Sequence, residues 1–106
     1  MRLDNFSEWL EKSYQKRDGK QLGLGARADA KSRCRRIEQF EGDLDLHFVR
    51  DKMQSLLESL TYSQQDANNG ISPRHRILID GDLVSGTASL RSAIRLYRLF
   101  CLSYMN

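Results

Sequence analysis

The sequence has few of the residues that stabilise small proteins covalently or interrupt their helices. Its 106 residues include one proline and two cysteines. Two cysteines do not make a disulfide framework, and together with the two scattered histidines they do not match a zinc-binding spacing. We expect Cys34 and Cys101 to be reduced core residues, because each falls on the apolar stripe of a predicted helix. No cofactor is expected.

Long apolar runs are also absent. No run approaches the roughly 18 residues needed to cross a bilayer, and the first ten residues contain no uninterrupted apolar segment of the signal-peptide type. Hydrophobic residues make up 40% of the chain and charged residues 29%, which is typical of an ordinary soluble protein. We expect one cytoplasmic domain spanning residues 1–106, without membrane contact.

Apolar residues recur at steps of three and four along most of the chain, which predicts an all-α domain. Helices are predicted over residues 5–15, 26–40, 49–60 and 87–104, with Trp9 docking the first and a long ordered loop preceding the last. One short apolar run at residues 77–79 has no second strand to pair with, so a sheet is not expected. The predicted fold is a single small bundle of four main helices.

The last of these helices carries the clearest pattern. Thr87 or Ser85 is expected to cap its start, because either side chain can accept a hydrogen bond from a free backbone N–H group. No residue inside it breaks helix geometry. One apolar stripe runs along it and consists of Leu90, Ala93, Ile94, Tyr97, Phe100, Cys101 and Tyr104.

Charge is segregated along the chain. Residues 15–36 contain eight basic and two acidic side chains, whereas residues 37–66 contain seven acidic and two basic ones. Residues 74–98 are basic again, with five arginines and two aspartates. Arginine dominates the basic segments, and its planar guanidinium group suits the recognition of phosphate and carboxylate.

Basic side chains form rows on the outer faces of two predicted helices, 26–40 and 87–104. If these helices lie side by side, the rows join in one surface that neutralises phosphates and releases counterions, as in nonspecific nucleic-acid binding. The other interpretation is that they are solvated helix faces, some of them paired with acids such as Glu38. The candidate nucleic-acid-binding residues are Lys20, Arg27, Lys31, Arg35, Arg36, Arg91, Arg95 and Arg98.

Catalytic patterns are weaker than the basic rows. His47 and Arg50 form an HxxR string with tyrosines downstream, as in the active sites of tyrosine recombinases, but a chain of this length cannot supply a whole catalytic domain. His75 is expected to be a loop residue, because no nucleophile with a recognisable context accompanies it. Aspartates in turns bond their own backbone more often than a cation, so no metal site is expected at the pairs Asp43 with Asp45 and Asp80 with Asp82. We therefore expect no enzyme activity.

Four segments follow one another in a recognisable order: FSEWL, SRCRRIEQFEGDLD, a leucine-rich stretch, and SLRSAIRLYRLF with its pattern of Ser89, Ile94, Tyr97 and Phe100. This order resembles the small helical DNA-binding module at the front of tyrosine recombinases and phage integrases, which also precedes some restriction-type nucleases. The resemblance implies helices that clamp one face of a duplex and contact its backbone phosphates. That role would fall on Lys31, Arg35, Arg91 and Arg95.

The chain departs from this family in having no domain after the module. Recombination and cleavage are therefore not expected, and binding alone remains. The resulting prediction is a stand-alone helical protein of a bacterium or mobile element that binds nucleic acid, with double-stranded DNA as the expected form. The alternative is a protein-interaction module, such as an inhibitor or accessory subunit of a nucleic-acid enzyme. It would use the acidic stretch from Glu38 to Asp51 against a basic groove, or the arginine rows against an acidic one.

Overall fold

The computed structural model describes residues 1–104, and every regular element in this range is a helix. The predicted all-α class is confirmed, but the described residues form six helices instead of the four that were predicted. No helix in this range combines the length and hydropathy that a membrane span requires. The helices are α1 Leu3–Lys12, α2 Leu24–Glu41, α3 Leu44–Asp51, α4 Gln54–Ser59, α5 Gln64–Asn68 and α6 Leu83–Tyr104.

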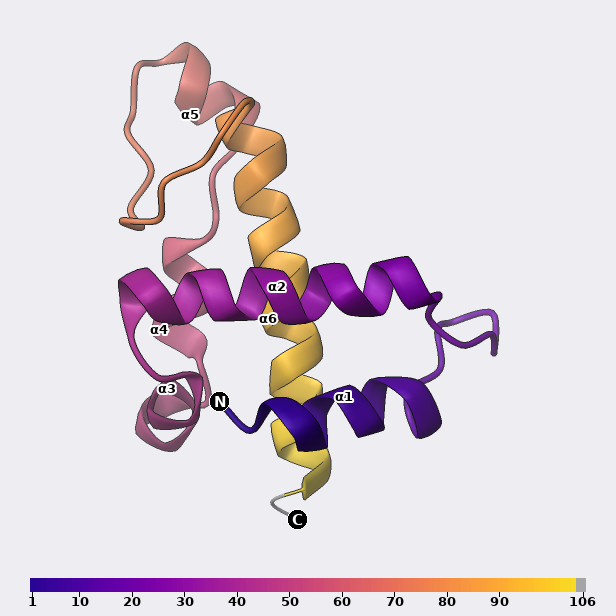
Figure 1. The fold of residues 1–106 in the computed structure, drawn as a ribbon. Helices are drawn as coiled ribbons and strands as arrows, with labels where there is room; N and C mark the ends of the chain where they lie inside the picture. Colours follow the sequence, from indigo (N-terminus) through magenta and orange to yellow (C-terminus); the bar gives the residue numbers. More distant parts are fainter. Residues whose placement is uncertain (105–106) are drawn as a thin grey trace.

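Helix α6 is the element on which most of the others pack (Figure 1). α2 crosses its middle, α1 crosses its C-terminal half beside α2, and α3 and α4 also contact it. The predicted apolar stripe of α6 is buried from Leu90 to Cys101, and α2 faces it with Ala30, Cys34 and Ile37. Both cysteines are buried and free, as predicted. Burial raises the pKa of Cys34 to about 12, so this thiol stays protonated.

Aromatic rings hold α1 against the C-terminal half of α6. Phe6 is fully buried and lies edge-on to Tyr97, with the ring centroids 5.0 Å apart. Trp9 contacts Phe100 at 5.9 Å and the ring of Tyr14, just beyond the helix end, at 5.3 Å. Aromatic pairs at these separations add to the free energy gained by burying their surface. The predicted docking of the first helix through Trp9 is confirmed.

The helix predicted over residues 49–60 is divided into α3 and α4. Lys52 and Met53 have left-handed backbone, with φ of 55° and 67°. A continuous helix would place the core residues of α3, Leu44 and Phe48, on a different face from the buried residues of α4. The break brings both sets into one core. The apolar spacing over residues 49–60 also predicts that Val49 is buried, but it is 73% exposed.

The left-handed conformation of Lys52 makes it a site for stabilisation. Left-handed backbone costs a residue with a β-carbon roughly 1 kcal/mol, and glycine is the usual residue where a helix ends in this conformation. We expect Lys52→Gly to raise the free energy of unfolding by about 0.5–1 kcal/mol, measured by urea denaturation. Lys52→Ala keeps the β-carbon and should give no gain. A loss of stability in Lys52→Gly would contradict the left-handed backbone.

The segment between α5 and α6 is a loop with bends, and it packs closely on the first turns of α6. Ile77 is buried, and a β-carbon at Gly86 would lie 2.5 Å from Cγ2 of Ile79. α6 begins at Leu83, a turn earlier than predicted, because the Asp82 carboxylate accepts a hydrogen bond of 2.8 Å from the Ser85 backbone N–H. The two predicted caps, Thr87 and Ser85, are therefore both inside the helix.

The contact between Gly86 and Ile79 predicts opposite effects at two helical glycines. Gly86→Ala should lower the free energy of unfolding by up to about 2 kcal/mol, because overpacking outweighs the gain of about 1 kcal/mol in helix propensity. Gly25 has open space around its Cα, so Gly25→Ala should be neutral or stabilising. Chemical denaturation measures both. In an Ile79→Ala background the Gly86→Ala penalty should disappear, and a penalty that persists would contradict the contact.

Candidate nucleic-acid interface

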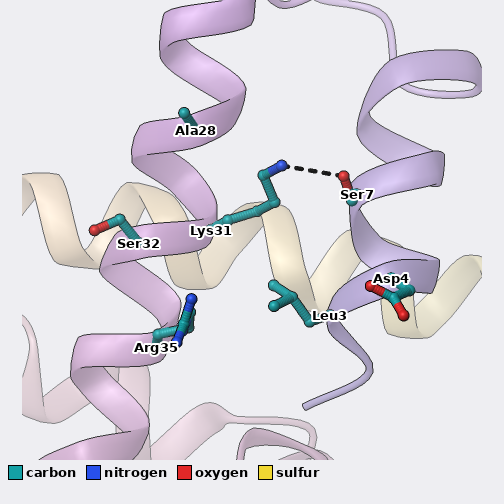
Figure 2. A pocket seen from close by; sticks show the side chains of 7 residues that line it. All are labelled: Leu3, Asp4, Ser7, Ala28, Lys31, Ser32 and Arg35. Carbon is teal, nitrogen blue, oxygen red and sulfur yellow. Dashed lines mark hydrogen bonds between the residues drawn. The ribbon is translucent and has the colours of Figure 1, made fainter.

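A groove of about 350 Å³ lies between α1 and α2 (Figure 2). Lys31 reaches across it from α2, and its Nζ donates a hydrogen bond of 3.1 Å to Oγ of Ser7 on α1. Arg35 lies one helical turn further along α2 and is exposed. The groove is lined by Leu3, Asp4, Ser7, Ala28, Lys31, Ser32 and Arg35.

The donors in this groove suit a phosphate. An ammonium group has three N–H donors, and the bond to Ser7 uses one of those on Lys31. The guanidinium of Arg35 presents five donors in a planar fork, the geometry that matches phosphate oxygens. The hydroxyl groups of Ser7 and Ser32 are further donors of the kind that commonly contact nucleic-acid backbones.

Asp4 is the one carboxylate among the residues that line the groove. In Figure 2 it lies on the α1 side, with Leu3 between it and Arg35. It would repel a bound phosphate, and it forms no ion pair with Lys31 or Arg35. The positive side of the groove is therefore its α2 side.

The two basic rows predicted from the sequence do not share one groove. Arg91 and Arg95 line a separate groove between α4 and α6. Arg98 donates through Nε to the backbone carbonyl of Lys52 at 2.9 Å, where it supports the break between α3 and α4. Arg36 donates to the carbonyl of Leu78 at 2.6 Å, on the side of α2 that faces the loop before α6. The structure thus brings only part of the predicted set together.

Lys20 and Arg27 do not line the α1–α2 groove, although both precede Lys31 in the chain. Lys20 is in the exposed turn between α1 and α2. A hydrogen bond of 2.9 Å from the Lys16 backbone N–H to the Lys20 carbonyl closes this turn. Arg27 is in the first turn of α2, one helical turn before Lys31. Three α2 residues at steps of four, Arg27, Lys31 and Arg35, are called the basic stripe below.

The eight candidate cations are not neutralised by the fold. Within residues 1–104, none of them lies within 4.0 Å of a carboxylate oxygen. The ion-pairing bases are others: Arg2, Lys12, Arg33 and Arg76. Glu38, the acid considered as a partner for the rows, pairs with the Met1 ammonium at 2.8 Å. No ion pair within this range therefore cancels the positive charge of the candidates.

The acidic stretch from Glu38 to Asp51 is largely engaged within the protein. The Met1 ammonium lies 2.7 Å from Asp43 as well as 2.8 Å from Glu38. Burial alone would lower the pKa of this ammonium, but its bonds to Asp43 and Glu38 raise it to about 10. Glu41 pairs with Arg76, and Asp51 accepts a hydrogen bond of 3.0 Å from the Ser55 backbone N–H. Of the five carboxylates in this stretch, all except that of Asp51 therefore have an ion-pair partner within residues 1–104.

The residues weighed for catalysis also have structural bonds. Nε2 of His47 lies 2.6 Å from the carbonyl of Glu41. Tyr97 is fully buried and donates its hydroxyl proton to Asp45 at 2.7 Å. Burial and this bond raise the pKa of Tyr97 well above its usual value of 10.0. Among residues 1–104, no three or more histidine, cysteine, aspartate or glutamate side chains are grouped as a metal site.

Comparison of the chain with known proteins found no match. The chain matches no protein-family model, no curated protein and no solved structure. The resemblance to the DNA-binding module of tyrosine recombinases and phage integrases stays a prediction.

The sequence did not identify the α1 side of the groove. Ser7 is 24 residues from Lys31, and no periodic pattern links the two helices. Ser32 was equally unremarkable as a small polar residue on a helix face. Only the helix pairing shows that the Ser7 hydroxyl lies beside the basic stripe, whereas Ser32 is on the same helix as the stripe.

His75 is a loop residue, as predicted, but it is 8% exposed and joins the loop to α6. Its Nδ1 accepts a hydrogen bond of 3.2 Å from the Ile77 backbone N–H. The other ring nitrogen, Nε2, therefore carries the proton and donates to Oγ1 of Thr87 at 2.9 Å. Burial lowers the pKa of His75 below its usual 6.5, against the opposing charge of Glu41.

This lowered pKa predicts a stability that depends on pH. The unfolded chain takes up a proton on His75 near pH 6.5 and the folded chain only at lower pH, so the contribution is full above pH 6.5 and falls below it. Each unit of difference is worth about 1.4 kcal/mol. His75→Gln keeps a donor and an acceptor but cannot titrate. Between pH 7.5 and 5, the free energy of unfolding of His75→Gln should fall less than that of the wild type. The difference between the two falls is the contribution of one titrating group. Equal falls would contradict the prediction.

Proposed function

We propose that the chain binds the phosphate backbone of double-stranded DNA through the basic stripe of α2 and the adjoining α1–α2 groove, without catalysis of its own. The observation that carries the proposal is the lack of carboxylate partners for these cations within residues 1–104, beside a groove that adds two hydroxyl groups. Charges held free of intramolecular pairing can neutralise phosphates and release counterions.

The spacing of the basic stripe is compatible with a nucleic-acid backbone. From Arg27 to Arg35 the helix rises about 12 Å, and one strand of a duplex advances about 3.4 Å along its axis per phosphate. The stripe therefore spans several consecutive phosphates. Lys20 in the preceding turn extends the positive surface beyond the helix.

The composition of the groove favours a duplex over a single strand. Proteins that bind single strands stack the bases on aromatic side chains, and such stacking supplies much of their affinity. No residue that lines the α1–α2 groove is aromatic, and Phe6 and Trp9 of α1 are buried in the core. Contacts to backbone phosphates carry no direct sequence information, so the proposed binding is sequence-independent.

A protein partner is the second candidate function, and exposed apolar side chains on α3 favour it. Leu46 is 59% and Val49 73% exposed, although both belong to a helix whose opposite face is in the core. Replacing both with serine should leave the fold intact and abolish capture of any stoichiometric partner that resists nuclease treatment. Capture that is unchanged in this variant would reject α3 as the contact surface.

Removing two charges from the groove tests the DNA proposal. Lys31→Gln with Arg35→Gln should weaken binding to a random-sequence duplex in fluorescence anisotropy titrations. Each lost phosphate contact should make the slope of log K against log salt concentration less steep by about 0.9, so by about 1.8 in the double variant. The loss should be similar for unrelated sequences.

Arg91→Gln with Arg95→Gln is the matched control, because it removes the same charge from the α4–α6 groove. It should leave the salt slope close to that of the wild type. Equal losses of slope in the two double variants would contradict the proposed location of the contacts. Absence of wild-type binding at low salt would reject DNA binding, and tighter binding to a single strand of the same sequence would reject the duplex.

A further inference from the structure

The groove between α4 and α6 contains two arginines that the proposed DNA contacts do not use. Its volume is about 230 Å³, and Arg91 and Arg95 enter it from α6, one helical turn apart. From the opposite side α4 and the residues after it contribute Gln54, Leu57, Glu58 and Thr61. The groove is thus separate in its lining from the one between α1 and α2.

Arg91 has a hydrogen-bond donor that the fold leaves without an acceptor. Its Nε is buried, and it is the one buried side-chain nitrogen or oxygen within residues 1–104 that has no hydrogen-bond partner. Buried donors are nearly always paired, since an unpaired one loses its bond to water without replacement. A bound acceptor in the groove would remove this cost.

Glu58 lines the same groove but does not supply that acceptor. Its Oε1 accepts a hydrogen bond of 3.1 Å from Nε2 of Gln54, and within residues 1–104 neither Arg91 nor Arg95 has a carboxylate within 4.0 Å. The charge of Glu58 repels a row of phosphates more than it repels a single carboxylate. Leu57 offers apolar contact to the methylene groups of an acidic side chain.

We propose that the α4–α6 groove binds an aspartate or glutamate side chain of a partner protein. Arg91 donates from Nε and one terminal nitrogen to the two carboxylate oxygens, the side-on geometry in which guanidinium and carboxylate match best. Since Nε is buried, the proposal requires the guanidinium to rotate toward the groove when the carboxylate binds. Arg95 adds a second positive charge beside it. The proposal does not depend on DNA binding, because it uses none of the residues of the basic stripe.

Titration of the full chain with a short acidic peptide, followed by NMR of the arginine Nε–Hε signals, tests the proposal. The probe is a blocked peptide with two glutamates, and the same peptide with glutamines is its control. The Arg91 signal, assigned by its absence in Arg91→Lys, should shift and saturate with the glutamate peptide only. Arg91→Lys keeps the charge but loses the fork, so peptide affinity should fall about tenfold, as expected for one charge-assisted hydrogen bond.

Two further variants keep the test decisive. Arg95→Gln changes an exposed residue and should also weaken peptide binding, which covers the case in which Arg91→Lys does not fold. Lys31→Gln with Arg35→Gln should bind the peptide as the wild type does. An Arg91 signal that does not respond to the glutamate peptide would overturn the proposal. So would a response to duplex DNA at a lower concentration than the peptide requires, because the groove would then belong to the nucleic-acid interface.

Discussion

The packing of α2 across α6 is the constraint on which the rest of the structure depends. Small side chains are buried between the two helices: Ala30 and Cys34 on α2 and Ala93 on α6, with the Cys34 thiol donating to the Ala93 carbonyl at 3.5 Å. Small residues let two helices approach closely, and the buried stripe then sets how each helix is rotated about its axis. On α2 this rotation directs Lys31 toward α1 and Arg36 toward the loop before α6.

The same rotation explains why the two arginine rows diverge. On α6 the stripe that contacts α1 and α2 has Arg91 and Arg95 on one flank, and α4 packs against that flank. On α2 the basic stripe lies on the flank that faces α1. Each row therefore borders a different neighbour, although both helices share one crossing. Two grooves with different linings result, which is why separate ligands are proposed for them.

The use of charge within the fold is asymmetric. Glu38 and Asp43 form ion pairs with the Met1 ammonium, and Glu41 forms one with Arg76. The candidate basic residues have no carboxylate partners within residues 1–104. The net charge of +3 does not show where the unpaired charge lies, because each ion pair cancels one acid and one base. The positive charge that a polyanion would meet comes from side chains that the fold leaves without carboxylate partners. This distribution supports a role in binding anionic ligands more than the composition alone does.

The sequence pattern predicted those helices in which the apolar residues stay on one face from end to end. The stripe of α6 and the aromatic face of α1 were identified because each keeps one periodicity over its whole length. The pattern over residues 49–60 failed because the apolar phase changes at Lys52 and Met53, where left-handed backbone starts a new helix. A change of phase within two residues cannot be told apart from an irregular apolar pattern by the sequence alone. Packing against α6 is what makes both faces part of one core.

The sequence by itself determined the helical class, the buried stripe of the last helix and the reduced state of the cysteines, because these follow from residue type and periodicity. It also determined which residues carry positive charge. Only the tertiary structure decided which of those charges share a groove, that Ser7 lies beside Lys31 and that Arg98 and Arg36 bond backbone carbonyls instead. The physical reason is that such relations join residues far apart in the chain, and they arise from how each helix is rotated when its apolar face is buried.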